Sequence, residues 1–428
     1  MLVTALPIET TIDRPERTYP LGLTLVYCDG LGRAGEQLSL ADLVSVALGY
    51  AERLFPGGAL EDPRMGDRHA TLTRKATAQA AGGFDGNTWV ISDRGHKSGT
   101  FVDGRRIREH TLSPGEVIRI GSTFMVFGHI APRSRSLMLN SVGAAMAVVE
   151  EGVASVARTE HPVLLLGENG TGKELVAHEV HRLSGRLGPF LALNCTSLRG
   201  ERLERALFGR VPDRSTPGAW TSNIEQQSDV LSSSAGLWRD GQPPTHEFQD
   251  GLLLRALDGT VFLDEVGEME EAVQRRLLHV LETRTLTPVG ATDEVPITTR
   301  IIAATNREVD AFGGSEHMLP ELYAFLSRWA VKLPALRERK EDLGVLVRVL
   351  LGRGAPGLDV TPDLMAALLA AHWPLNIRGL VDVLTTARRS QQKAPRLDVA
   401  SAVRATLEAQ SYIPAPGSSS TLDLRKPL

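Results

Sequence analysis

The sequence predicts a multidomain protein with an N-terminal β-sandwich, an α/β domain that carries a phosphate-binding loop, and a small helical lid. Three observations indicate this fold class. Short alternating apolar runs dominate the N-terminal part of the 428-residue chain, which is typical of β-strands. In the middle, apolar strands alternate with helical patterns, which indicates a parallel, doubly wound sheet. Only helical periodicity follows, and the length allows two or three domains.

The β-sandwich is expected over residues 21–130. Runs such as Thr88–Ser92 and Glu116–Ile120 alternate in polarity and are separated by Gly, Pro, Asp and Asn. Residues 1–20 are predicted to be a disordered lead-in, and the polar residues 131–136 a linker.

The α/β domain is expected over residues 137–352, the lid over residues 353–412 and a disordered tail over residues 413–428. After about Gly352 we expect no further strands. The predicted strands of the α/β domain are Val163–Leu166, Phe190–Leu193, Val261–Leu263 and Arg300–Ala304. The helical patterns of the lid are Pro362–His372, Arg378–Ser390 and Val399–Gln410.

The strongest functional signal is a glycine-rich loop between an apolar strand and a helix. Such a loop wraps a triphosphate with backbone N–H groups while its lysine neutralises charge. The loop residues are Gly167, Glu168, Asn169, Gly170, Thr171, Gly172 and Lys173. The next residue is Glu174, where a Ser or Thr would place a hydroxyl on Mg²⁺. We therefore expect ATP to bind here and Mg²⁺ to depend on other carboxylates.

Two carboxylates follow a second apolar strand, Val261–Leu263. In this arrangement Asp264 would hold Mg²⁺ and Glu265 would polarise the attacking water. The alternative is a helix cap made by the same two side chains. Another strand ends at Asn306, whose amide is a candidate sensor of the γ-phosphate or a simple turn former.

The composition excludes several classes of protein. The formal net charge is −4, so no global positive field attracts nucleic acid. Only Cys28 and Cys195 occur, too few for a disulfide framework or a cysteine-rich zinc site. No stretch approaches the roughly 18 consecutive apolar residues of a membrane span, and the N-terminus lacks a basic leader. We expect a cytoplasmic protein without a membrane partner.

Six ordered motifs resemble the AAA+ domain of sigma-54-dependent transcription activators, the bacterial enhancer-binding proteins, over roughly residues 137–410. The resemblance implies a ring of like subunits that uses Mg-ATP to remodel sigma-54 RNA polymerase. It also implies that Lys173 grips phosphates, that Asn194 restrains Glu265, and that Asn306 and Arg378 are the first and second sensors. The motifs are GENGTGKELVAHEVH (167–181), PFLALNC (189–195), DGTVFLDEVGEM (258–269), RIIAATNRE (300–308), LPALRERKEDL (333–343) and WPLNIRGL (373–380).

The sequence departs from that family at its arginine fingers. Both finger positions are apolar here, at Leu319 and Phe325. A missing finger costs about 10³–10⁵ in rate, because nothing else neutralises the charge on the transferred phosphoryl group. Arg328, about one helical turn further on, is a candidate relocated finger, and the alternative is a plain surface arginine.

A second departure concerns the loop with which the family contacts sigma-54. The nearest match is Gly218, Ala219, Trp220 and Thr221, followed by Ser222 and Asn223 in place of two small residues. Residues 224–250 form a polar insert, for which we weigh disorder against a different partner surface. No helix-turn-helix pattern follows the lid, so we expect no specific DNA binding.

The N-terminal half resembles a forkhead-associated domain, a reader of phosphothreonine peptides. The similar segments are residues 63–70 and 92–104. His69 matches the structural histidine of that family. The phosphate-binding positions hold Tyr50, Gly66, His96 and Ser98 instead of the usual residues, so we expect the fold without the phosphothreonine pocket.

Two roles therefore follow from the sequence. The first is an ATP-binding regulator of sigma-54-dependent transcription that acts through protein contacts, including a partner of the N-terminal domain. The second is a scaffold that holds ATP without hydrolysing it and works through the sandwich and the polar insert. The apolar finger positions favour the second role, whereas Asp264, Glu265 and Arg378 favour the first.

Overall fold

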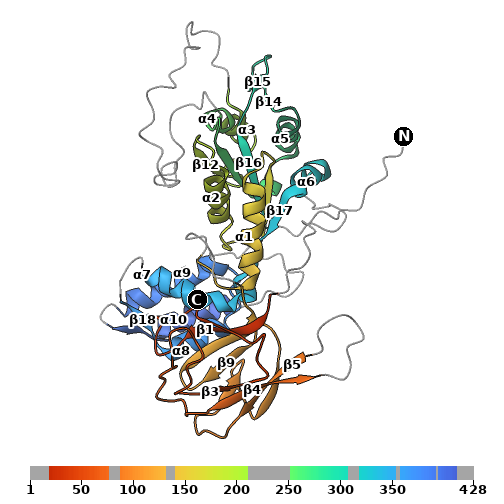
Figure 1. Ribbon diagram of the computed structural model, residues 1–428. Helices are drawn as coiled ribbons and strands as arrows, with labels where there is room; N and C mark the ends of the chain where they lie inside the picture. Colours follow the sequence, from red (N-terminus) through yellow and green to blue (C-terminus); the bar gives the residue numbers. More distant parts are fainter. Residues whose placement is uncertain are drawn as a thin grey trace. The chain divides into compact units, whose positions relative to one another are not determined.

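The computed structural model describes residues 19–76, 87–131, 140–210, 251–306, 318–352, 357–391 and 394–411. Within these residues the chain forms two compact units. One comprises residues 146–334 and the other comprises residues 19–131, 140–145 and 335–411. Figure 1 shows the helices and strands of both units.

The first unit is a three-layer α/β domain around a five-stranded sheet in the order β12-β13-β16-β11-β17. All four strand pairings are parallel, as the sequence predicts. The near-continuous apolar runs follow from burial on both faces of the sheet. Its strands are β11 (Val163–Leu166), β12 (Phe190–Asn194), β13 (Thr260–Asp264), β16 (Arg300–Thr305) and β17 (Ala330–Lys332).

Helices cover both faces of this sheet, as Figure 1 shows. Helices α1 (Ala144–Ala157) and α2 (Lys173–Ser184) pack on one face. The other face carries α3 (Glu201–Phe208), α4 (Leu252–Arg255), α5 (Glu271–Thr283) and α6 (Pro320–Leu326). The shorter elements of this unit are η2 (Val266–Glu268), η3 (Ser327–Trp329), β14 (Thr285–Leu286) and β15 (Val295–Pro296).

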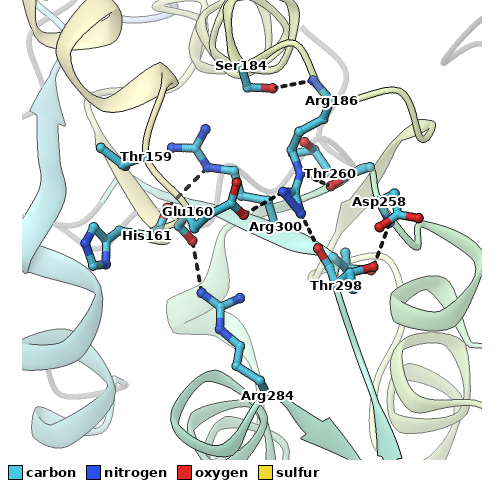
Figure 2. A network of polar contacts seen from close by, with 12 residues as sticks. Thr159, Glu160, His161, Ser184, Arg186, Asp258, Thr260, Arg284, Thr298 and Arg300 are labelled. Carbon is cyan, nitrogen blue, oxygen red and sulfur yellow. Dashed lines mark hydrogen bonds and ion pairs between the residues drawn. The ribbon is translucent and has the colours of Figure 1, made fainter.

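Arg300 ties α1 to the sheet from the first position of β16 (Figure 2). Its fully buried guanidinium donates to the carbonyl oxygens of Val156 (2.6 Å), Ala157 (2.7 Å) and His161 (3.2 Å). These are carbonyls at and beyond the C-terminus of α1, where a helix lacks internal donors and attracts cations. Burial lowers the pKa of Arg300 to about 10, so the side chain keeps its charge at neutral pH.

The second unit contains an antiparallel β-sandwich. One sheet has the order β2-β1-β10-β9-β6-β7 and the other the order β3-β4-β5-β8. Strands β1 to β5 are Leu21–Tyr27, Gln37–Ser39, Ser45–Leu48, Ala70–Ala76 and Asn87–Asp93. Strands β6 to β10 are Thr100–Val102, Arg105–Ile107, Glu109–Leu112, Val117–Ile120 and Thr123–His129.

The same unit contains the C-terminal helices. They are η4 (Leu336–Glu338), η5 (Lys340–Asp342), α7 (Leu343–Gly352), α8 (Pro362–Ala370), α9 (Asn376–Ser390) and α10 (Ser401–Ser411). Helix α7 packs in one apolar cluster with α8 and α9, although the sequence assigns it to the α/β domain. The domain boundaries themselves stay predictions.

The expectation that no strand follows Gly352 is wrong in one detail. Residues Asp359–Val360 (β18) pair in parallel with Arg396–Leu397 (β19). Two-residue strands are too short for a hydrophobic period to be recognised in the sequence.

Candidate functional site

The glycine-rich loop connects β11 to α2, where the sequence predicts it. Gly167, Gly170 and Gly172 have φ values of 155°, 78° and 105°, which side chains with a Cβ rarely adopt. Thr171 closes the loop, since its hydroxyl donates to the carbonyl of Glu168 at 2.8 Å. The loop thus leads into the N-terminus of a 12-residue helix, the usual place for a bound anion.

Lys173 is buried at the start of α2, with 6% of its surface exposed. Its ammonium donates to the carbonyl of Gly167 at 2.9 Å and to that of Glu168 at 3.5 Å. A buried ammonium requires such partners, because desolvation of a lone charge is costly. Lys173 is therefore held against the loop that it would serve.

The carboxylates Asp264 and Glu265 lie at the carboxyl end of β13. Glu265 Oε1 is 3.5 Å from Lys173 Nζ, and Glu265 Oε2 accepts the backbone N–H of Asn306 at 3.2 Å. Burial raises the pKa of Glu265, and the charge of Asp264 raises it further, whereas Lys173 lowers it. The structure thus joins the glycine-rich loop, the carboxylate pair and the end of β16 at one edge of the sheet.

Glu265 has a left-handed backbone conformation, with φ 57° and ψ 50°. This conformation is uncommon for a residue with a side chain, and such strain is concentrated at functional sites. The backbone reversal begins η2 directly after the strand, and the carbonyl of Glu265 accepts the N–H of Glu268 at 3.0 Å.

Asn194 lies beside the carboxylates, because it pairs in register with Asp264 across β12 and β13. Its Oδ1 atom accepts the backbone N–H and the hydroxyl of Thr196, at 2.9 and 2.6 Å. In this conformation the amide oxygen of Asn194 serves its own turn. The restraint of Glu265 by Asn194 stays a prediction.

The remaining predicted residues lie elsewhere. Arg328 is exposed on η3, with its guanidinium carbon 5.2 Å from the centre of the Phe325 ring. Arg378 is exposed on α9 in the second unit, and Glu174 is exposed in the first turn of α2. Gly218, Ala219, Trp220 and Thr221, together with the polar insert 224–250, lie outside the described residues.

The two finger positions pack against the α/β core. Leu319 and Phe325 both pack against the apolar cluster of α5 and α6, and the Leu319 N–H donates to Gln274 Oε1 at 2.7 Å. Both side chains are only partly buried, so these positions make apolar contacts at the margin of the cluster.

Sequence reasoning missed two backbone segments of the site. The Gly167 N–H donates to the carbonyl of Thr305 at 3.3 Å. A Cβ added to Gly167 would lie 3.1 Å from the carbonyl oxygen of Leu333. Backbone groups of this kind leave no residue-type signal in a sequence.

The chemistry of the donor set fits a magnesium-bound nucleotide. Main-chain N–H groups and one ammonium suit phosphate, and paired carboxylates suit a hard cation. Across the described residues, no cluster of three or more His, Cys, Asp or Glu side chains is placed to hold a metal by itself. Mg²⁺ usually takes one or two carboxylates and completes its shell with phosphate and water.

In the sandwich, the residues that the sequence analysis singled out lie close together. His69 is fully buried, with Nδ1 accepting the Gly66 N–H and Nε2 placed 3.1 Å from the carbonyl of Gly99. A Cβ added to Gly66 would lie 2.9 Å from His96 Cδ2, and His96 Nδ1 is 2.6 Å from the Ser98 hydroxyl. The His96 ring therefore occupies the space beside Gly66, where the resembling family has a phosphate-binding hydroxyl.

Fold and site together define a P-loop α/β domain combined with an antiparallel sandwich. The chain carries a sigma-54 interaction domain, matched over residues 139–236 and 244–332, and an FHA domain, matched over residues 56–121. These matches confirm the two family resemblances seen in the sequence.

Curated relatives resemble the α/β part. The putative uric acid sigma-54-dependent transcriptional regulator UacR of Escherichia coli is 34% identical over 240 residues, which cover 54% of this chain and 36% of the relative. The regulatory protein AtoC of the same organism is 33% identical over 272 residues, covering 62% of this chain and 51% of the relative. The chain thus spans about a third to a half of the length of these relatives.

A solved structure supports the fold of the α/β domain. NtrX from Brucella abortus in complex with ATP is 28% identical to this chain, with a TM-score of 0.51. The likeness covers 63% of this chain and 57% of NtrX. Among the described residues, no helix has the length and apolar character needed to cross a membrane.

Proposed function

We propose that this chain is an ATP-binding AAA+ regulator of sigma-54-dependent transcription that acts through protein contacts. The contact between Lys173 and Glu265 beside the glycine-rich loop carries the proposal, because it places a phosphate-binding cation next to a candidate catalytic carboxylate. The ATP complex of NtrX and the sigma-54-dependent regulation named for UacR support it.

In this proposal the residues at the edge of the sheet have distinct roles. The loop 167–172 and Lys173 bind the phosphates, and Asp264 would hold the Mg²⁺ that accompanies the nucleotide. Bound Mg²⁺ would neutralise phosphate charge and orient the γ-phosphate. Glu265 accepts a proton from the attacking water, and Asn306 and Arg378 sense the nucleotide. Like subunits form a ring, sigma-54 RNA polymerase is the target, and the FHA domain contacts a protein partner.

A non-hydrolysing scaffold is the second candidate function. The packing of Leu319 and Phe325 against the α/β core favours it, since both family finger positions hold apolar side chains instead of arginines. A scaffold of this kind binds ATP at the same loop and works through the sandwich and the insert 224–250.

Calorimetric titration with Mg-ATP tests the binding step that both functions share. The wild-type chain should bind, and Lys173→Ala should weaken binding by a hundredfold or more, because the buried ammonium is lost from the phosphate site. Lys97→Ala, an exposed lysine of the sandwich, is the matched control and should bind like the wild type. Equal affinity of the Lys173→Ala chain would overturn the assignment.

Steady-state ATPase measured across protein concentration then separates the two functions. A specific activity that rises with concentration supports a ring enzyme, because each site needs a neighbouring subunit. ATP binding without turnover at any concentration supports the scaffold. A phosphothreonine peptide array should show no saturable binding to the sandwich, since the His96 ring fills the space beside Gly66.

A further inference from the structure

The larger sheet of the sandwich is apolar on both faces where β1, β9 and β10 lie side by side. Side chains alternate between faces along a strand, so Leu25 and Met125 point into the sandwich while Phe124 and Val126 point outward. The outward residues are nevertheless buried, with 3% of Phe124 and 2% of Val126 exposed. A sheet of this kind needs a cover on its outer face.

The C-terminal helices supply that cover within the same unit. The outward side chains of β1, β9 and β10 share one cluster with Leu343 and Val347 of α7 and with residues of α8 and α9. The approach is close, because a Cβ added to Gly344 of α7 would lie 2.1 Å from the carbonyl oxygen of Val26. The backbone of α7 therefore rests directly on β1.

Hydrogen bonds frame this apolar contact on several sides. The buried Tyr27 hydroxyl donates to the carbonyl of Val360 at 3.0 Å. The Leu31 N–H donates to Asp359 Oδ1 at 3.2 Å. From α7, Arg348 Nη1 donates to the carbonyl of Gly32 at 3.1 Å, and Arg396 Nη2 on β19 donates to the carbonyl of Asp29 at 3.0 Å. Directional bonds to backbone atoms fix one orientation, which an apolar contact alone does not.

We propose that the sandwich and the C-terminal helices fold and move as one cooperative body. The outer face of the sandwich is then part of the hydrophobic core of the C-terminal helices. The sandwich is not an independent domain on a flexible linker. A partner bound to the sandwich acts directly on α9 and its Arg378, without passing through the linker. The consequence for nucleotide sensing rests on the proposed function, whereas the cooperative folding does not.

Hydrogen exchange of the full chain, followed by mass spectrometry without nucleotide, tests the proposal. Gly344→Ala introduces a methyl group against Val26, while alanine itself favours the helix. We expect exchange to accelerate at least tenfold both in β1 and β10 and in α8 and α9. Gly352→Ala is the matched control on the same helix, since no atom lies within 4 Å of its added Cβ, and it should leave exchange unchanged. Acceleration confined to one side of the contact would overturn the proposal.

A reciprocal variant starts from the sandwich. Leu25→Ala opens a cavity in the inner core of the sandwich, away from the helices. In a cooperative body it should accelerate exchange in α8 and α9 as well, whereas wild-type protection of these helices would contradict the proposal.

A milder variant covers the case in which these chains fail to fold. Tyr27→Phe removes only the hydrogen bond to Val360 and should accelerate exchange severalfold on both sides of the contact. A one-sided response would again count against the proposal. Because no nucleotide is present, a failure of ATP binding cannot be mistaken for a failure of this test.

Discussion

Lys173 and Glu265 lie in contact at the carboxyl ends of the parallel strands, with the lysine Nζ 3.5 Å from the glutamate Oε1. Burial raises the pKa of Glu265, and Lys173 only partly offsets this effect. The ionised carboxylate is therefore held in an unfavourable environment. A raised pKa makes this carboxylate a better proton acceptor than an ordinary exposed glutamate.

The first prediction follows from that raised pKa. The folded chain binds a proton at Glu265 more readily than the unfolded chain does, so this group lowers stability as the pH rises through the window between the two pKa values. Glu265→Gln removes the penalty. Its melting temperature without nucleotide should exceed that of the wild type at pH 8, and the difference should shrink towards pH 4.5.

An exposed glutamate of α5 gives the control for this comparison. Glu282→Gln should leave the melting temperature unchanged across the same pH range. A Glu265→Gln chain that melts below the wild type at pH 8 would show that the ion pair with Lys173 outweighs burial. With ATP, the same variant should retain bound nucleotide if the chain hydrolyses it, because the carboxylate that activates water is gone.

The second prediction concerns Arg328. If the chain hydrolyses ATP with a relocated finger, Arg328→Ala should lower kcat by about 10³ without a comparable change in ATP affinity. Arg275→Ala, an exposed arginine of the same unit, should have no such effect. The measurement is steady-state turnover at a protein concentration that saturates assembly.

A gain-of-function variant separates a relocated finger from a missing one. Leu319→Arg places a guanidinium at a family finger position while leaving Phe325 in the core. If Arg328 already serves as the finger, turnover should not rise. An increase of a hundredfold or more would show that the wild-type site lacks a finger.

The glycine-rich loop and the strands of the α/β unit could be predicted because their signals are local. Apolar runs such as Val163–Leu166 are long enough to mark buried parallel strands, and Gly170 and Gly172 mark backbone that only glycine adopts readily. Asp264 and Glu265 followed from their place after a strand. Strand β17 (Ala330–Lys332), which pairs with β11 on the side opposite β16, is not predicted from the sequence. Its three residues are too few to show a hydrophobic period.

The packing of the C-terminal helices on the sandwich could not be predicted, although the sequence shows that the sheet is buried on both faces. Residues Phe124 to Phe127 form a continuous apolar run in β10. In a strand with one solvent-exposed face, apolar and polar residues would alternate instead. Periodicity shows that both faces are buried but not what buries them. The helices that do so lie more than 200 residues further along the chain, and only tertiary contacts identify them.

The third prediction concerns Arg300. Arg300→Met keeps most of the side-chain volume but leaves three carbonyls at and beyond the C-terminus of α1 without their donor. At about 1–3 kcal/mol for each unsatisfied buried group, unfolding of the α/β unit should become easier by about 3 kcal/mol or more. Arg284→Met removes a single bond to the carbonyl of Glu160 and should cost about 1 kcal/mol. Urea unfolding measures both, and equal losses would refute the capping role.

The fourth prediction is a pH dependence of the sandwich. Burial lowers the pKa of His69, and the adjacent His96 lowers it further, although the carbonyl of Gly99 opposes them. The neutral ring accepts the N–H of Gly66 at Nδ1, which a protonated ring cannot do.

The folded pKa of His69 therefore lies below the unfolded value of about 6.5, and the unfolded chain binds more protons between the two. The contribution of His69 to stability is complete above pH 6.5 and is lost as the pH falls towards the folded pKa. His69→Gln should cost about 1–2 kcal/mol at pH 7.5 and should flatten the dependence between pH 7 and 5. Hydrogen exchange in β4 and β5 reports the unit that contains the sandwich, which keeps His178 and His181 of the other unit out of the measurement. An unchanged slope in the His69→Gln chain would assign the titration to another group.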